Sequence, residues 1–510
     1  MLADRNRHEP LSTNNTSVDE TTESESLTGR ATRGATWAVL GFATSQVLRL
    51  GGNLILTRLL FEEAFGLMAL VQVVQQGLGL FSDIGIGPSI VQNKRQDDAF
   101  LNTAFTLQAA RGVVLTLVGV ALGQPVAAFY GEPELAYLLP FVSLTAFIAG
   151  FNSTRVFTLS RELSLGRLQV VLVVSQVVGL VVMILWALAQ RSVWALAIGA
   201  VTTTLTYGLM THVYLPGIRN RFRWEAKAAR SQIRFGRWIF VSTVMTFLTM
   251  QSDRLVFGKL FSVGMLGVYS IGAMIAALPI MGISLLIQKV IFPAYSRVFH
   301  RNRTLGPAFD RARKPMLLLA GWAFSGLLAG GPAAARLMYD ERYHGAGWVI
   351  QALSIGGWFL AMSMTHRAAL LAIGRPQWLA ASSVAKLLGM FAFIPAGYYM
   401  GTSIAPDMAF PGAVLGFSAS ELLRHATTSY AVSRAKLRTV RLDLTLTAFV
   451  SLVGGLGAFA GQLMADSEWP VVVEAGVIAV GVSLVWMPLG WPEVKELFPN
   501  LANRITKPFT

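Results

Sequence analysis

Apolar segments of membrane-spanning length recur along most of the chain, and short polar or Pro- and Gly-marked breaks separate them. A helix rises ~1.5 Å per residue, so about 20 apolar residues cross the ~30 Å hydrocarbon core of a bilayer. The pattern predicts an all-α integral membrane protein with about fourteen transmembrane helices, at residues 34–57, 64–91, 104–129, 135–159, 167–190, 193–215, 236–258, 263–288, 315–337, 346–373, 377–399, 408–432, 442–464 and 470–489.

The composition agrees with a membrane protein, because 54% of the 510 residues are apolar and only 14% are charged. The chain contains no cysteine, which excludes disulfides and thiolate metal sites. It contains neither the G-x-x-x-x-G-K-[ST] string of an ATP-driven pump nor an H-E-x-x-H zinc motif. The largest predicted outer loop, around "MYDERYHGAG", is too short to house a membrane glycosyltransferase, polymerase or ligase. We therefore expect no catalytic residues, no metal and no cofactor.

Basic residues are distributed unequally between the two sides of the predicted membrane. Most of the 42 Lys and Arg residues fall on the side of the N-terminus, so we expect both termini to be cytoplasmic. The polar residues 1–30 are typical of a disordered cytoplasmic tail, and residues 491–510 form a second tail. The basic stretch 219–237 is interpreted as a cytoplasmic loop that orients the chain and attracts anionic lipid, rather than as a nucleic-acid site.

An internal repeat is visible when the sequence is shifted by 201 residues. The shift aligns Trp37 with Trp238 and Gly66 with Gly267, and it carries the first two spans onto the seventh and eighth. Six spans are an even number, so the two halves would share one orientation. The repeat predicts two pseudo-symmetric six-helix lobes, at residues 31–218 and 238–435, around a central cavity. Two extra C-terminal helices follow at 436–490.

Two stretches give the chain a family resemblance, "SDRLVFGKLFSVGMLGVYS" at residues 252–270 and "YHGAGWVIQALSIGGWFLAMSMTHRAALLAIGRP" at residues 343–376. With fourteen predicted spans, the chain resembles a bacterial polysaccharide-export flippase of the Wzx type, in the multidrug/oligosaccharidyl-lipid/polysaccharide superfamily. The resemblance covers residues 30 to 490. It implies translocation of an undecaprenyl-pyrophosphate-linked oligosaccharide across the inner membrane by alternating access. A polysaccharide polymerase and a chain-length regulator would be its partners, besides membrane lipids.

Charged residues inside predicted spans are the candidates for function, because a charge at mid-bilayer costs about 2.5–3.5 kcal/mol. Apart from two residues at each span end, these positions are Arg49, Asp83, Arg111, Arg155, His212, Asp253, Arg254, His366, Arg367, Lys386, Glu421, Arg424, His425 and Glu474. Without the histidines, cations outnumber acids, which favours an anionic ligand. The candidates for binding pyrophosphate are Arg49, Arg254, Arg367, Lys386 and Arg424. Arg49 is the first choice, because it lies deep in span one and a planar guanidinium can bind two oxygens.

The remaining charged candidates, Asp83, Asp253, Glu421 and His425, could couple ions or form structural pairs. Asp253 is expected to pair with another helix, and a structural or a cavity role for it is equally compatible with the sequence. Glu421 and Arg424 are spaced i, i+3 and are expected to pair with each other. A lone histidine such as His425 is more often structural than a proton carrier, and the "IGIGP" context of Asp83 favours a hinge.

Three glutamines on span two, Gln72, Gln75 and Gln76, share one helical face. Their amides could bind sugar, but a helix–helix seam is slightly favoured. Two related functions stay open on the sequence alone. A cation-coupled multidrug exporter would be expected to have an acidic cavity, and a flippase for the cell-wall precursor lipid would share the anionic head group.

Overall fold

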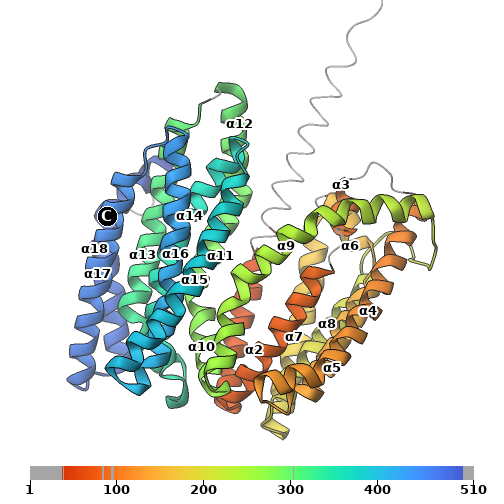
Figure 1. The fold of residues 1–510 in the computed structure, drawn as a ribbon, viewed down its shortest axis with the longest axis horizontal. Coiled ribbons are helices and arrows are strands. Elements are labelled where there is room, and N and C mark those ends of the chain that lie inside the picture. Colours follow the sequence, from red (N-terminus) through yellow and green to blue (C-terminus); the bar gives the residue numbers. More distant parts are fainter. Residues whose placement is uncertain are drawn as a thin grey trace, which may run out of the picture.

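The computed structural model describes residues 37, 40–82, 86–92, 97–162, 164–302 and 304–497, and within these ranges it contains helices and their connections but no strand (Figure 1). The predicted tail at residues 1–30 and Asp83 lie outside the described residues. The first part of the chain forms an N-terminal bundle of a helix at residues 40–59, α2 Glu62–Phe81, α3 Ile86–Gln92, α4 Asp98–Tyr130, α5 Leu135–Gly150, α6 Arg155–Arg161, α7 Leu165–Ala189 and α8 Trp194–Val213.

The second part of the chain forms a C-terminal bundle beside the first, and its long first helix also packs against α2 and α4 of the N-terminal bundle (Figure 1). Its elements are α9 Ala226–Leu260, α10 Val263–Ala276, α11 Leu278–Leu286, the π-helix η1 Ile287–Ile291, α12 Phe292–Asn302, α13 Gly306–Met338, the 3-10 turn η2 Glu341–Tyr343, α14 Ala346–Ala372, α15 Gln377–Ile404, the 3-10 turn η3 Pro406–Met408 and α16 Ala409–Arg434. Two further helices, α17 Val440–Asp466 and α18 Val471–Leu497, pack against α13.

The described residues of all fourteen predicted spans are mainly helical, although not every span is apolar along its whole length. In the described part of the chain, nine helices are long and apolar enough to cross a membrane, or ten if the bent pair α5 and α6 is one span. The polar and charged side chains along α9 and α16 keep these two helices out of that set. The all-α membrane fold is therefore confirmed, and the count of fourteen stays a prediction.

The structure corrects two predicted boundaries. The basic stretch 219–237 is not a loop throughout, because α9 begins at Ala226 and continues without a break into the seventh span. Ala, Lys, Arg and Gln are good helix formers, so the helix extends beyond the apolar segment that predicted it. The last helix, α18, continues to Leu497, past the predicted end of the last span at residue 489.

The predicted fourth span is broken between α5 and α6, which meet at an angle of 61°. The break leaves backbone carbonyls without helical partners. The buried Gln108 amide on α4 donates to three of them, at 3.0 Å from Ala149 O, 3.3 Å from Gly150 O and 3.1 Å from Asn152 O. Gln108 thus stabilises an interruption that hydropathy alone does not reveal.

The element boundaries confirm the internal repeat. A shift of 201 residues carries the start of α2 onto the start of α10, and a shift of 208 carries both ends of α4 onto both ends of α13. A shift of 211 carries the start of α5 and the end of α6 onto the two ends of α14. The two bundles are therefore built from the same order of helices, and the growing offset reflects short insertions in the second half.

The two bundles meet where α2 crosses α10 (Figure 1). A Cβ placed on Gly66 would lie 2.0 Å from the Val263 carbonyl oxygen, and one placed on Gly267 would lie 1.9 Å from the Glu62 carbonyl oxygen. Glu62 and Val263 are related by the shift of 201 residues, as are the two glycines. The contact is therefore reciprocal, as expected when a pseudo-two-fold axis along the membrane normal passes through it.

The connection between α13 and α14 also touches the N-terminal bundle. The Tyr343 hydroxyl donates to the Leu60 carbonyl oxygen at 3.2 Å, and the Tyr343 ring packs edge-on against Phe65. The guanidinium of Arg342 lies 5.0 Å from the centre of the Phe61 ring. These contacts close the lower end of the molecule in Figure 1, and the bundles diverge toward the upper end.

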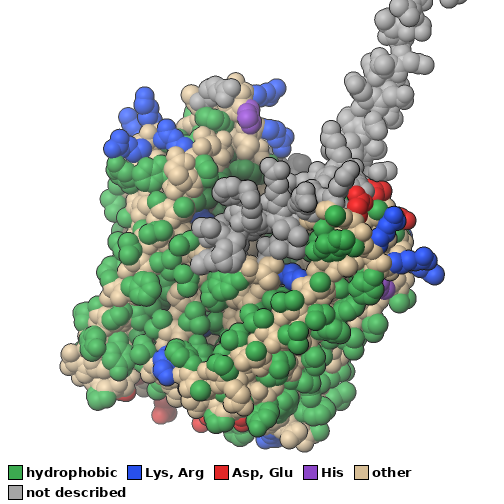
Figure 2. Space-filling view, turned by 45° about the vertical axis from the view of Figure 1, so that its right-hand side comes forward, with side chains coloured by type: hydrophobic (Ala, Val, Ile, Leu, Met, Phe, Trp, Pro, Cys, Tyr) green, Lys and Arg blue, Asp and Glu red, His purple; other side chains and the backbone are tan. Residues whose placement is uncertain are grey.

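Charged side chains are distributed unequally between the two ends of the molecule. In Figure 2 many Lys and Arg side chains gather at the upper end, together with a few acidic ones at the upper right. Acidic side chains outnumber basic ones along the lower edge, and apolar side chains cover most of the surface between the two ends. Such a distribution fits a protein whose middle faces lipid and whose two ends face water.

Candidate functional site

A cavity of about 870 Å³ lies inside the C-terminal bundle, between α9, α10, α11, α14, α15 and α16. We call it the cationic cavity, because four basic and two acidic side chains line it: Arg254, Arg367, Lys386, Arg424, Asp253 and Glu421. The structure thus brings four of the five predicted cation candidates together in one cavity, with two of the four predicted acid or histidine candidates.

Lys386 and Glu421 form a buried ion pair in the cavity wall, with Lys386 Nζ 2.7 Å from Glu421 Oε1. The Lys386 ammonium also donates to the Thr249 carbonyl oxygen at 3.1 Å and lies 4.8 Å from the centre of the Phe417 ring. These contacts join α15, α16 and α9. Lys386 is therefore committed to protein partners, and its first role is to hold the wall of the cavity together.

Arg424 shares the same carboxylate, as the i, i+3 spacing predicted. Its Nε lies 3.3 Å from Glu421 Oε2, and both side chains are about 5% exposed. One carboxylate therefore faces two cations, and the Arg424 Nε and Nη2 atoms have no hydrogen-bond partner among the described residues. A buried guanidinium with unused donors is costly, which makes Arg424 a candidate for binding an anion.

Arg367, from α14, is the least engaged cation in the cavity. It is half-buried, and no hydrogen bond or ion pair joins its guanidinium to another described residue. Arg254 donates to Gln251 Oε1 on its own helix at 3.2 Å, and its Nε has no partner among the described residues. The donors that a ligand could use are thus concentrated on arginines.

Asp253 pairs with a neighbouring helix, as predicted, and not with the adjacent Arg254. The Tyr269 hydroxyl of α10 donates to Asp253 Oδ2 at 2.6 Å, and both side chains are buried. This bond fixes α10 against α9 at the edge of the cavity. Of the two adjacent charges on α9, Asp253 is therefore buried against a tyrosine of the neighbouring helix.

Arg49 lies outside the lining of the cationic cavity but close to it. It is exposed on the helix at residues 40–59, where it donates to Gln46 Oε1 at 2.5 Å and to the sulfur of Met281 on α11 at 3.3 Å. No ion pair joins it to a described carboxylate, and its proposed partner Asp83 lies outside the described residues. The structure thus places Arg367 ahead of Arg49 as a ligand-binding candidate.

His425 is not a lone histidine. It belongs to a cluster behind the cavity wall, in which His366 and His425 place Nε2 atoms 3.6 Å from Asp443 Oδ2. Arg313 donates to the other oxygen of Asp443 and to Thr365 Oγ1. The cluster joins α13, α14, α16 and α17, so its first role is to hold these four helices together.

His366, His425 and Asp443 also offer ligand atoms within 4.8 Å of one another, a spacing that one metal ion could fill. Two features of the cluster disfavour this use. Arg313 already compensates the charge of Asp443, and the two imidazole rings stack at 22° with their centres 5.3 Å apart. A metal lies in the ring plane of each histidine that binds it, and two nearly parallel stacked planes share no such point.

Sequence reasoning missed Arg313 and Asp443, because both fall at or beyond the ends of predicted spans. The helices α13 and α17 begin earlier than the apolar runs, so these charges are buried instead of interfacial. Three other arginines, of which only Arg155 is buried, bind protein groups. Arg155 donates to carbonyl oxygens of residues 212, 215 and 218, Arg336 binds Glu474 through both carboxylate oxygens at 2.6 Å, and Arg111 donates to Gly79 O.

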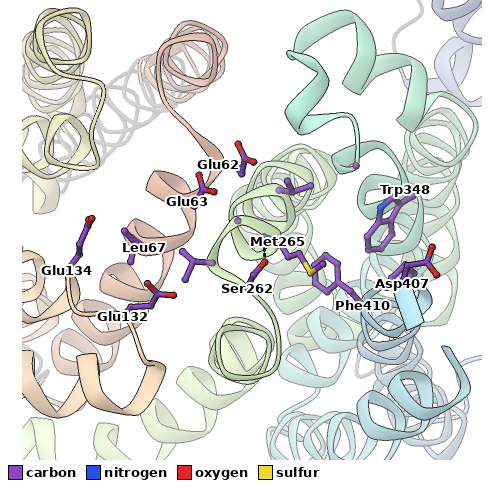
Figure 3. A pocket seen from close by; sticks show the side chains of 15 residues that line it. Glu62, Glu63, Leu67, Glu132, Glu134, Ser262, Met265, Trp348, Asp407 and Phe410 are labelled. Atoms are coloured by element: carbon purple, nitrogen blue, oxygen red, sulfur yellow. Dashed lines mark hydrogen bonds between the residues drawn. The ribbon is translucent and has the colours of Figure 1, made fainter. Parts of the chain in front are cut away.

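A second pocket, of about 730 Å³, lies between the bundles beside the crossing of α2 and α10. Figure 3 shows Glu62, Glu63, Glu132 and Glu134 on the side of the N-terminal bundle and Asp407 on the opposite side. No Lys or Arg is among the described residues that line it. Acidic side chains thus surround the closed end of the molecule, opposite in charge to the cationic cavity.

A third cavity, of about 670 Å³, lies inside the N-terminal bundle. We call it the neutral cavity, because its lining includes amides, hydroxyls and aromatic rings, among them Gln75, Gln76, Thr204, Tyr207 and Phe157, and no acidic residue among the described ones. The glutamines on α2 also bridge helices, as predicted. Gln75 Nε2 donates to Ser143 Oγ at 2.7 Å, and Gln76 accepts from Gln251 on α9.

The sequence is similar to those of known polysaccharide biosynthesis proteins. Residues 55–346 match the family described as polysaccharide biosynthesis proteins. The lipopolysaccharide biosynthesis protein WzxC of Escherichia coli K12 is 22% identical over 436 residues, which cover 84% of this chain and 86% of WzxC. The succinoglycan biosynthesis transport protein ExoT of Rhizobium meliloti is 23% identical over 347 residues, covering 68% of this chain and 69% of ExoT.

The fold is shared with a solved transporter. The structure of the lipid II flippase MurJ in an inward closed conformation superposes with a TM-score of 0.67 at 12% identity, covering 89% of this chain and 99% of the other. At that identity the likeness concerns the fold, and it supports the two-bundle architecture with its central space.

Proposed function

Because the chain belongs to the family of polysaccharide biosynthesis proteins, we propose that it moves undecaprenyl-pyrophosphate-linked oligosaccharides across the bacterial inner membrane. The oligosaccharide would be a repeat unit of O-antigen, exopolysaccharide or capsule. The names of the relatives WzxC and ExoT, from lipopolysaccharide and succinoglycan biosynthesis, support this class of substrate. The protein acts as a transporter, and no chemical bond is made or broken.

The observation that carries the proposal is the surplus of basic side chains in the cationic cavity. Four cations face two carboxylates there, and the arginine donors left over have no described protein partner. A pyrophosphate supplies several oxygens with spread negative charge, and guanidinium groups bind such oxygens in pairs. Arg367 and Arg424 are the proposed principal contacts, with Arg254 beside them and Arg49 at the entrance.

Alternating access fits the arrangement of the two bundles. They share one order of helices, pack together through a reciprocal contact of α2 with α10, and diverge toward the basic end (Figure 1). We propose that this divergent end faces the cytoplasm, with both chain termini on that side. The substrate would enter there, and a polymerase with a chain-length regulator would take it over on the outer side.

The proposal is tested by arginine variants in the cells that make the polymer. Arg367→Ala should lower surface or secreted polysaccharide more than tenfold, because each charge-assisted hydrogen bond contributes about 1.5–3 kcal/mol. Arg367→Lys should keep part of the export, since it retains charge but loses the planar fork. The measurements are polymer export, membrane abundance of the variant, and lipid-linked oligosaccharide on the cytoplasmic side.

Arg434→Ala is the matched control, because Arg434 is an exposed arginine on α16 that stacks on Tyr430 outside the cavity. It should export normally. Full export by Arg367→Ala and Arg424→Ala would refute the pyrophosphate site. Two other outcomes identify the alternative functions. Normal polymer with greater sensitivity to cationic drugs indicates a multidrug exporter, and arrested peptidoglycan synthesis indicates a flippase for the cell-wall precursor.

A further inference from the structure

The cationic and neutral cavities occupy equivalent places in the two halves of the repeat. Along α2, a shift of 201 residues carries Gln76 and Gly79 of the neutral cavity onto Ala277 and Ile280, both of which line the cationic cavity. Ile86 and Gly87 on α3 are carried in the same way onto residues 287 and 288 of the cationic cavity. The correspondence thus extends over two elements.

Residues on the opposite wall of each cavity also occupy equivalent positions in the two halves of the repeat. There the offset between the halves is 211 residues, as the boundaries of α5, α6 and α14 show. It carries Thr145 onto Gly356 and Val156 onto Arg367, and all four residues line their respective cavities. On these two walls the cavities occupy equivalent positions in the two bundles, although α4 lines the neutral cavity and its counterpart α13 does not line the cationic cavity.

Equivalent positions carry different chemistry in the two bundles. Where the cationic cavity has Arg367, the neutral cavity has Val156, and where the cationic cavity has Ala276 and Ala277, the neutral cavity has Gln75 and Gln76. The one charged residue among the described lining of the neutral cavity is Arg111, whose guanidinium donates to Gly79 O at 2.6 Å and to Ser82 Oγ at 2.9 Å. This cavity thus presents amide and hydroxyl groups.

We propose that the neutral cavity is the subsite for the sugar units of the substrate, whereas the cationic cavity holds the pyrophosphate; this division rests on the proposed function. Uncharged sugars are bound by amide and hydroxyl groups together with aromatic rings, and the neutral cavity offers Gln75, Thr204 and Tyr207 beside Phe157. Gln75 donates one of its two amide N–H groups to Ser143 and keeps its carbonyl oxygen as an acceptor.

The two subsites lie on either side of one contact. Gln76 lines the neutral cavity and accepts a hydrogen bond from Gln251 on α9. The neighbours of Gln251 on the same helix, Met250 and Asp253, line the cationic cavity. A head group whose pyrophosphate occupies one cavity can therefore direct its sugars toward the other without crossing the apolar exterior.

The test measures binding of two lipids to the purified full-length protein in nanodiscs. One probe is undecaprenyl pyrophosphate without sugar, and the other is the lipid-linked oligosaccharide extracted from cells in which the gene has been deleted. Gln75→Leu and Tyr207→Phe should each weaken binding of the sugar-bearing lipid about tenfold, because a hydrogen-bond partner is lost. Both variants should bind the sugarless lipid as the unaltered protein does.

Two controls separate sugar binding from packing. Gln72→Leu changes an exposed glutamine one turn away on α2 that lines none of the three cavities described, and it should leave both affinities unchanged. Ser143→Ala removes the same hydrogen bond as Gln75→Leu but leaves the Gln75 amide in place. It should therefore bind the sugar-bearing lipid within about twofold of the unaltered protein.

The inference is wrong if the two pocket variants weaken both lipids equally, if they weaken neither, or if Ser143→Ala reproduces the loss. Arg367→Gln in the same assay tests the pyrophosphate site separately, since it should weaken both lipids. Unchanged affinities for Arg367→Gln, combined with a sugar-specific loss in Gln75→Leu, would remove the pyrophosphate assignment and leave the sugar subsite standing.

Discussion

Arg313 and Asp443 form a buried ion pair behind the cationic cavity. The side chains are 1% and 6% exposed. Moving each ion out of water costs several kcal/mol. Further polar contacts with Thr365 and the two histidines help to offset this cost. Most of the buried charges in the described part of the chain are held in this way, whereas the half-buried Arg367 has no hydrogen bond or ion pair to another described residue.

Replacing Asp443 by Ala should destabilise the protein by about 3–5 kcal/mol, since it leaves Arg313 buried without a counter-charge. The measurement is the thermal unfolding midpoint in detergent, together with membrane abundance. Asp466→Ala is the control, because Asp466 is an exposed acid on the same helix that bonds only to the neighbouring Gln462. A double Arg313→Met, Asp443→Leu variant should recover most of the loss, and an unfolding midpoint for Asp443→Ala equal to that of the control would contradict the structural role.

At the scale of the helices, the crossing of α2 and α10 fixes how the two bundles meet. The close approach depends on glycine in both helices, because a side chain at either position would collide with a backbone carbonyl and not with a flexible side chain. Small residues at such crossings let helix backbones touch within the membrane. The helices could separate only by shifting one bundle against the other.

Gly66→Val and Gly267→Val should each disturb the contact, with a cost of about 1–3 kcal/mol if the helices can adjust. Because the two positions are equivalent, the two variants should lose export to a similar degree. Gly264→Ala on α10 is the control, since its new Cβ would have its nearest neighbour at an ordinary 3.4 Å. Normal export and abundance in either valine variant would show that the close contact is dispensable.

At the scale of the whole molecule, one end is mainly basic and the opposite end is mainly acidic. The bundles diverge toward the basic end and close at the acidic end, where Tyr343 and Arg342 reach the N-terminal bundle (Figures 1 and 2). A conformation open to the side of the basic loops is the one expected to receive an anionic lipid made in the cytoplasm.

The polarity predicts a labelling pattern for single-cysteine variants, which this cysteine-free chain makes easy to interpret. In intact cells, an impermeant thiol reagent should label Glu134→Cys and Asp466→Cys, which lie near the acidic end. It should not label Arg223→Cys or Arg438→Cys until the membrane is opened. All four residues are exposed, so burial does not confuse the result. Labelling of either arginine position in intact cells would contradict this topology and place the basic end outside.

The sequence could predict features that depend on neighbours along the chain. The helix positions, the repeat of the two halves and the Glu421–Arg424 pair follow from hydropathy, spacing and helical geometry, and the structure contains all three. The excess of basic over acidic residues inside the predicted spans also follows from counting them in the sequence. Helix ends were less predictable, because Ala, Lys and Arg continue α9 and α13 beyond their apolar parts and so bury Arg313.

Only the tertiary structure decided which charges have partners. Depth inside a predicted span favoured Arg49 over Arg367, yet Arg49 lies beside Met281 outside the cavity, and Arg367 faces into it without a partner among the described residues. His425 lies beside Asp443 only because α16 and α17 pack together around α13 and α14. Such contacts join helices far apart in sequence, and their geometry is set by packing rather than by local pattern.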